Sequence, residues 1–187
     1  MKTSLRPAAL PALTLSVLTL ALSACGDRDG DAAAGPATPP EASRTLADEL
    51  GEGRATLGRV VESSGLATVL DGVGPYTVLA PTDAAFGQGG ADLTEAGMRA
   101  QAAALLRAHM LPGAVTREDI LAAIDSGGGQ ASMRNMGGGV VTFTRDGDAI
   151  VAAGPDGVSA RLTDEEEPTG NGVIQPIDGL LIAPEPS

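Results

Sequence analysis

Apolar residues recur at helical spacing in the first part of the chain that can fold. Leu57, Val60 and Val61 fall at positions i, i+3 and i+4 of one segment, which places them on one face of a helix. The pattern predicts helices over 45–52 and 56–64 and a short helical turn over 66–70. Gly65 is the expected end of the second helix.

The middle of the chain alternates between a strand pattern and helix patterns. Residues 76–80 (YTVLA) are typical of a strand, which we expect Pro81 to end. Thr82 or Asp83 can cap a short helical turn that reaches Phe86. The longest helix is predicted over 94–110, with Thr94 as its cap and Pro112-Gly113 as its end. One face of this helix carries Met98, Ala102, Leu105, Leu106 and His109.

A further short helix is predicted over 117–124, and the last third of the chain then changes to strand patterns. We expect strands over 140–144, 149–153, 158–162, 173–177 and 180–183. Asp146-Gly147 and Asp178-Gly179 are turn signals between neighbouring strands. The glycine clusters 127–129 and 137–139 are interpreted as joints between elements. Helices followed by strands, with no internal repeat, favour one α+β domain over 44–187.

The N-terminal residues are interpreted as an export signal followed by a tether. Lys2 and Arg6 precede an apolar run over 8–22, which is too short to span a membrane and is typical of a secretory signal peptide, assigned here to 1–24. Residues 26–43 are rich in Gly, Ala, Pro and Asp and carry no large apolar side chain, so we interpret them as a disordered tether, with a specific binding segment as the alternative. The only cysteine, Cys25, lies between these two segments.

Charge and cysteine content exclude several functions. The formal net charge is −12, and removal of Lys2 and Arg6 with the signal peptide leaves 10 basic and 24 acidic residues, a charge of −14. Such a chain is repelled by phosphate backbones, so we expect no nucleic-acid partner. A single cysteine permits neither an intramolecular disulfide nor a Cys/His zinc cluster. We expect a monomer without a cofactor.

Leu22-Ser23-Ala24-Cys25 resembles the lipobox that the bacterial lipoprotein signal peptidase cleaves. The resemblance implies that Cys25 becomes the first mature residue and carries acyl chains, which would anchor the protein in a membrane. An ordinary signal peptide with an unrelated cysteine is the alternative. The expected location is the cell envelope, on the outer membrane or a membrane facing the periplasm.

Three further motifs resemble the fasciclin domain. Residues 74–86 (GPYTVLAPTDAAF) are similar to its first signature, residues 105–113 (LLRAHMLPG) to its central helix, and residues 171–184 (NGVIQPIDGLLIAP) to its closing signature. The resemblance implies a β-wedge or sandwich packed by several short helices, with an adhesion or interaction activity. It implies structural roles for Thr82, Asp83, His109, Asn171 and Asp178, and places an expected partner contact at His109, Asp119, Ile120 and Leu121.

Two residues depart from the family pattern. Gln175 stands where family members usually have His, which weakens any function built on that histidine. Pro176 stands where a β-branched residue is usual. Because proline removes a ladder donor, we expect its strand to lie at a sheet edge or to begin nearby.

The side chains that could perform chemistry are few. We expect His109, the only histidine, to be buried, neutral and bridged to the loop near Thr82 and Asp83 rather than to act as a general base. Asp83 and Asp178 are interpreted as a cap and a turn residue, although an acid pair is the alternative. The acidic run Asp164–Glu167 is interpreted as a solvated loop, with a weak calcium site as the alternative.

We therefore expect a non-catalytic, membrane-anchored adhesion or interaction module of the envelope, with an envelope or extracellular protein or a glycan as its partner. Two other functions stay open. One is an envelope protein that binds a small hydrophobic ligand or a polysaccharide. The other is a hydrolase, suggested only by the loose acidic residues.

Overall fold

The computed structural model describes residues 44–88 and 92–182. Cys25, the signal peptide and the tether lie outside these residues. Three short helices open the folded part: α1 (Leu46–Gly53), α2 (Ala55–Ser64) and α3 (Ala67–Leu70). Thr45 caps α1 through a reciprocal pair of bonds with Asp48. Gly65 ends α2 in the left-handed conformation, with φ 74°, as expected from the sequence.

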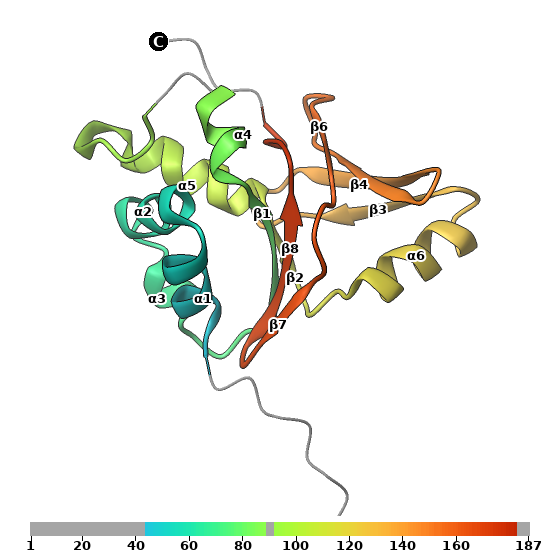
Figure 1. Ribbon diagram of the computed structural model, residues 1–187, viewed down its shortest axis with the longest axis horizontal. Coiled ribbons are helices and arrows are strands. Elements are labelled where there is room, and N and C mark those ends of the chain that lie inside the picture. The colour runs from blue at the N-terminus through green and yellow to red at the C-terminus, as the bar shows by residue number, and fades with distance from the viewer. Residues whose placement is uncertain (1–43, 89–91, 183–187) are drawn as a thin grey trace, which may run out of the picture. The chain divides into compact units, whose positions relative to one another are not determined.

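Two four-stranded sheets follow (Figure 1). The first has the order β2 (Met110–Pro112), β1 (Tyr76–Pro81), β8 (Gly172–Ile177), β7 (Glu167–Thr169). Its centre is a parallel pair in which β1 and β8 run side by side over their whole length. The second sheet is an antiparallel meander of β3 (Gln130–Arg134), β4 (Val140–Asp146), β5 (Ala149–Ala153) and β6 (Ser159–Arg161). The α+β class predicted from the sequence is confirmed.

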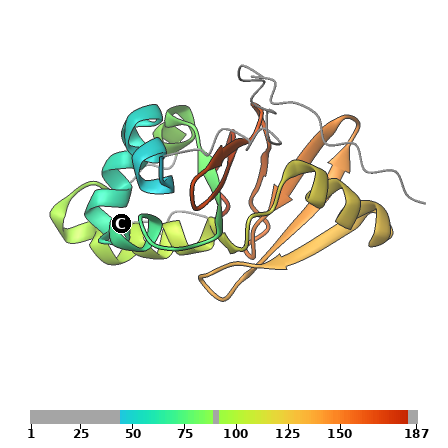
Figure 2. The same cartoon turned by 90° about the horizontal axis from the view of Figure 1, so that it is seen from below.

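The remaining helices lie on opposite sides of the first sheet. These are α4 (Asp83–Gln88), a 3₁₀ turn η1 (Ala96–Met98), α5 (Arg99–Ala108) and α6 (Arg117–Ser126). Figures 1 and 2 show α1 to α5 gathered on one side of β1 and β8, while α6 covers the second sheet on the other side. The first sheet is therefore covered on both faces, and every residue of β8 is buried.

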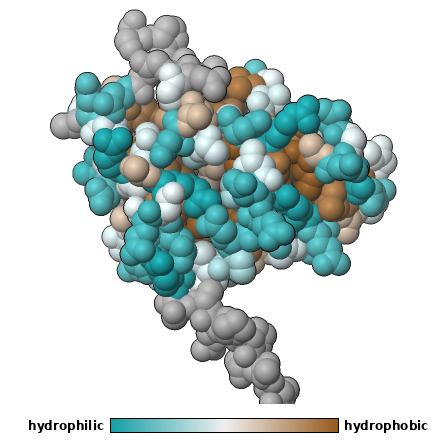
Figure 3. Space-filling view, viewed as in Figure 1, coloured by the Kyte–Doolittle hydropathy of each residue, from teal (hydrophilic) through white to brown (hydrophobic). Residues whose placement is uncertain are grey.

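The core is divided in two by the first sheet. Alternate residues of β1 point to opposite faces, so Val78 and Ala80 pack with the helices while Leu79 packs toward the second sheet. Phe143 and Ile120 lie in the second cluster and are fully buried. Figure 3 shows hydrophobic surface where α6 lies against β3; the partly buried residues of this cluster are Val115, Leu121, Ala123 and Met133.

The predicted helix over 94–110 is wrong at both ends. The α-helix begins at Arg99 after η1, with Met98 rather than Thr94 at the cap position, and it ends at Ala108. From His109 onward the backbone pairs with β1: the His109 carbonyl accepts from Leu79 N, and Met110 lies opposite Val78. Pairing with a strand far away in sequence therefore replaces the last helical turn.

Two predictions about the closing segment are also wrong. Residues 180–182 are not a strand, because the turn after β8 does not form a hairpin. The strand that contains Pro176 is an inner strand, not an edge. The pairing of β8 with β7 reaches only Ile174, so Pro176 lies beyond the end of β7. The Pro176 carbonyl accepts from Thr163 N, which shows that the hydrogen-bonding groups of Pro176 face away from β1. The missing N–H of proline thus removes no bond from the β1–β8 ladder.

The glycine clusters occupy joints between elements, as expected. Residues 127–129 connect α6 to β3, and residues 137–139 form the turn between β3 and β4. Over the residues that the structure describes, no helix has both the length and the apolar character required to cross a membrane.

Candidate functional site

The start of α6 carries three of the residues expected to contact a partner. Asp119 closes a capping box: its carboxylate accepts from the N–H of Thr116 at 3.0 Å, and its own N–H donates to Thr116 Oγ1 at 3.1 Å. Hydrogen bonds from Thr116 lower the pKa of Asp119. Ile120 is fully buried, so it offers no surface to a partner. Asp119 is exposed and Leu121 is half-buried, and these two remain accessible.

A polar cluster lies beneath this corner of α6. The side chain of Gln175 is fully buried, and its Nε2 donates to a Glu166 carboxylate oxygen at 2.8 Å and to the Val115 carbonyl at 3.2 Å. The same Glu166 oxygen accepts from Arg117 N at 2.5 Å, at the first turn of α6. A carboxylate is stabilised there by the unpaired N–H groups and the dipole of the helix.

Two atoms of this cluster have no hydrogen-bond partner in the structure: Gln175 Oε1 and Arg117 Nε. The Arg117 guanidinium donates instead through Nη2 to the carbonyl of Asp164. These contacts fasten residues 164–166 against α6. The sequence patterns do not predict this cluster; its signals are the polar Gln175 within an apolar strand and the acidic run Asp164–Glu167 shortly before it.

The carboxylates of the acidic run point to different partners. Glu166 binds Arg117 N and Gln175, while Glu167 forms an ion pair with Arg54 at 2.7 Å. Within residues 44–88 and 92–182, no group of three or more His, Cys, Asp or Glu side chains is placed to hold a metal ion. The calcium alternative therefore gains no support from the geometry.

His109 is fully buried and uses both ring nitrogens within the domain. Its Nδ1 lies 2.8 Å from the Leu105 carbonyl, and its Nε2 accepts from Leu181 N at 3.0 Å. The ring is therefore neutral, with its proton on Nδ1. Burial lowers the pKa of His109 to about 4, against the opposing effect of the bond to Leu105. The expected bridge to Thr82 and Asp83 is wrong, and a buried His109 side chain cannot form part of a contact surface.

Asp83 and Asp178 bind different elements instead of forming an acid pair. Asp83 accepts from Thr56 N at 2.9 Å and so caps α2, whose own cap residue Arg54 provides no such bond. Asp178 accepts from Arg161 N at 2.7 Å and ties the end of β8 to β6. Thr82 contributes through its backbone, with its N–H bound to the Ile177 carbonyl. All three act as structural links.

Asn171 joins three segments at the opposite end of β8. Its Oδ1 accepts from Leu46 N at 2.8 Å, and its Nδ2 donates to the carbonyls of Leu70 and Gly72, both at 2.7 Å. The start of α1, the end of α3 and the turn before β8 thus meet at one side chain. This agrees with the structural role implied by the closing signature.

Two shallow hollows lie on the helical side. The larger, of about 380 Å³, lies between α2, α4 and residues 92–94. The smaller, of about 340 Å³, lies between α1, α2 and α3. Arg59 and Asp83 give the larger hollow both signs of charge, and Phe86 and Val60 give it an apolar wall.

Comparison with known proteins identifies the family to which this chain belongs. The family model described as the fasciclin domain matches residues 52–183. A solved structure of a FAS1 domain pair from the insect cell adhesion molecule fasciclin I is similar in fold, with a TM-score of 0.55 and 20% sequence identity. The match covers 67% of this chain and 44% of that one, so this chain spans less than half of the domain pair. Since the family model covers most of the described residues, the chain belongs to the fasciclin domain family.

Proposed function

We propose that this protein is a lipid-anchored, extracytoplasmic adhesion or interaction module of the cell envelope and that it performs no catalysis. Fasciclin domains are associated with cell adhesion and interaction, and they are generally non-enzymatic. One observation about this chain carries the proposal. The side chains of His109, Asn171, Asp83 and Asp178 are each bound to backbone groups of the domain. Their chemistry supports the fold, which leaves the surface as the functional part.

The α6 corner is the part of that surface on which the family resemblance placed a partner contact. Asp119 and Leu121 stand on a helix whose first turn is held by the capping box and by Glu166. A contact residue on such a rigid element loses little conformational freedom on binding. Glu118 is exposed beside them.

The anchor rests on the sequence around Cys25. The apolar run, the small residues before the cysteine and the tether after it together match the arrangement of a lipoprotein. The acidic domain gains no attraction to an anionic membrane from its own net charge, so acyl chains would have to provide the attachment.

Two measurements on the full-length protein test the proposal. The Cys25→Ser variant should lose the acyl mass at its N-terminus and leave the membrane fraction, whereas the wild type should leave it only with detergent. Adhesion of cells or vesicles that carry the protein should fall in a Glu118→Arg, Leu121→Gln variant and persist in Glu62→Arg, a charge reversal at an exposed residue of α2. Acylation of Cys25→Ser identical to that of the wild type would contradict the lipid anchor. Adhesion unchanged by the α6 substitutions would contradict the proposed contact at α6.

A second candidate function rests on the larger hollow. Its volume of about 380 Å³ and its pairing of Arg59 with an apolar wall would suit a small amphipathic ligand or a sugar unit. A thermal-shift screen of lipids and oligosaccharides tests this function, because a ligand that binds only the native state raises the melting temperature by mass action. Arg59→Gln should remove such a shift.

A further inference from the structure

The turn between β3 and β4 presents an exposed hydrophobic surface in an otherwise acidic molecule. Met136 and Val140 are each 40% exposed and stand at the two ends of the glycine cluster. Arg134 lies directly opposite Val140 in the β3–β4 pairing. We define the turn surface as Met136, Val140, Arg134 and Arg107. The Arg107 carbonyl accepts from Gly137 N, so the exposed Arg107 side chain begins next to the turn.

The turn is held rigidly against the end of α5. The buried Asn135 donates from Nδ2 to the Ala108 carbonyl at 3.0 Å and accepts at Oδ1 from Gly139 N at 2.8 Å. Met136 N donates to the Met110 carbonyl at 2.9 Å, and Gly137 N donates to the Arg107 carbonyl at 3.0 Å. Met136 and Val140 therefore stand partly in water on a backbone that these bonds hold in place, and such a backbone loses little conformational entropy on binding.

Two exposed basic residues flank the turn of a chain that is acidic overall. Acidic residues outnumber basic ones by 24 to 12 in the whole sequence. Arg107 and Arg134 are nevertheless exposed, and in the part of the chain that the structure describes neither forms an ion pair. Arg134 donates only to the Gly138 carbonyl. Pro155, which precedes Asp156 in the chain, lies close to Gly139.

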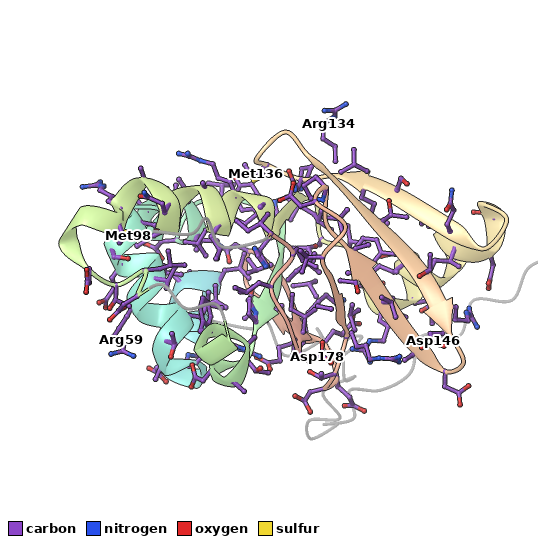
Figure 4. The ribbon with its side chains drawn as sticks, turned by 90° about the horizontal axis from the view of Figure 1, so that it is seen from above. Arg59, Met98, Arg134, Met136, Asp146 and Asp178 are labelled. Carbon is purple, nitrogen blue, oxygen red and sulfur yellow. The ribbon has the colours of Figure 1, made fainter. Side chains whose placement is uncertain are left out.

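Figure 4 shows Arg134 and Met136 together on one edge of the molecule, with the Arg134 side chain directed away from the body. Arg59 and Met98 lie away from them, among the helices. Met98 is half-buried and lies outside the turn surface, so it provides a comparison position for Met136.

We propose that the turn surface docks an acidic segment of another envelope protein, with an apolar side chain of that segment against Met136 and Val140 and its carboxylates on Arg107 and Arg134. This inference rests on the proposed interaction function and names the chemistry of one partner. Guanidinium groups suit carboxylates because their donors match both oxygens. A short acidic segment meets only the turn surface, whereas an extended anionic lipid surface would also face the acidic remainder of the domain, which repels it.

Site-specific photocrosslinking in cells that make the full-length protein tests this proposal. A photoreactive amino acid replaces Met136 in one variant and Met98 in the other. We expect an adduct with a different protein only from position 136, joined to a peptide in which acidic residues outnumber basic ones. Its yield should fall about tenfold when Arg107→Gln and Arg134→Gln are added, the loss expected for two exposed ion pairs. Arg99→Gln with Arg145→Gln, which removes two exposed arginines outside the turn surface, should leave the yield unchanged.

Other outcomes overturn the proposal. These are no adduct at 136, equal adducts at 136 and 98, an adduct with lipid or a second copy of this chain, or a partner peptide without excess acid. Carbodiimide coupling of the wild-type carboxylates to amines of neighbouring proteins gives a separate, position-independent measure of interaction. Coupling without an adduct at 136 would reject the turn surface and leave the interaction function standing, whereas loss of both would reject the function itself.

Discussion

The Nε2 atom of His109 accepts a hydrogen bond from the backbone N–H of Leu181, 72 residues away along the chain. This bond joins the end of α5 to the segment that follows β8. The Nδ1 atom of the same ring is bound to the Leu105 carbonyl, so the imidazole links two parts of the core. The only histidine of the protein is thus a structural residue.

Replacement of His109 by Ala should destabilise the domain by about 2–4 kcal/mol, because it leaves a cavity and an unpaired Leu181 N–H in the core. His109→Gln should cost less, since its amide oxygen can accept from Leu181. Urea unfolding of both variants measures the two costs. A His109→Ala variant as stable as the wild type would contradict the structural role.

His109 should also make the domain sensitive to acid. Its pKa is about 4 when folded and about 6.5 when unfolded, so the unfolded chain binds more protons between these values. Stability should therefore fall as the pH drops from about 6.5 to about 4, by about 3 kcal/mol in total, and stay level above that window. The difference in unfolding free energy between wild type and His109→Gln isolates this effect from the carboxylates. A difference that does not change with pH would show that folding does not lower the pKa of His109.

Asn171→Ala should cost about 2–3 kcal/mol, because three backbone groups of α1, α3 and the following loop lose their partner. The Asn171→Asp variant tests the donor role of Nδ2. It keeps the acceptor for Leu46 N but places negative charge against the carbonyls of Leu70 and Gly72. We expect it to be no more stable than the Ala variant at pH 7 when both are unfolded in urea; a fully stable Asp variant would rule out the donor role of Nδ2.

Gln175→Glu should be destabilised at pH 7 and should recover in acid. The new carboxylate would face Glu166 in a buried position, which raises the pKa of one of the two groups. Its protonation as the pH falls relieves the repulsion, so the deficit relative to wild type should be smaller at pH 5 than at pH 7. Gln175→Met, of similar volume, should show a smaller deficit that does not depend on pH, because it also removes the unpaired Oε1. Equal deficits at both pH values would mean that Glu166 does not face position 175.

Limited proteolysis tests the boundary predicted between the tether and the domain. A protease of broad specificity should cut first within 26–43, because segments without a core are the preferred sites of cleavage. N-terminal sequencing of the stable fragment gives the boundary. A dominant early cut near Leu105, within α5, would show that the predicted boundary is wrong.

Local patterns were sufficient for much of the fold. The spacing of Leu57, Val60 and Val61 predicts α2, and turn residues such as Asp146-Gly147 predict the β4–β5 hairpin, because these signals depend on neighbours a few residues apart. The three fasciclin motifs extended the prediction from single elements to the fold of the whole domain. The same reasoning placed His109 in the core, since its helix face is apolar.

The errors share one physical cause, which is that a side chain or strand can take its partner from any part of the chain. Met110–Pro112 is a strand only because β1 is available beside it, and residues 180–182 are not a strand because Leu181 N–H is bound to His109. Asp83 caps a helix that begins 28 residues earlier, and Gln175 meets Glu166 across the corner beneath α6. Periodicity shows that a residue is buried, but the packing of distant segments decides which atom it meets there.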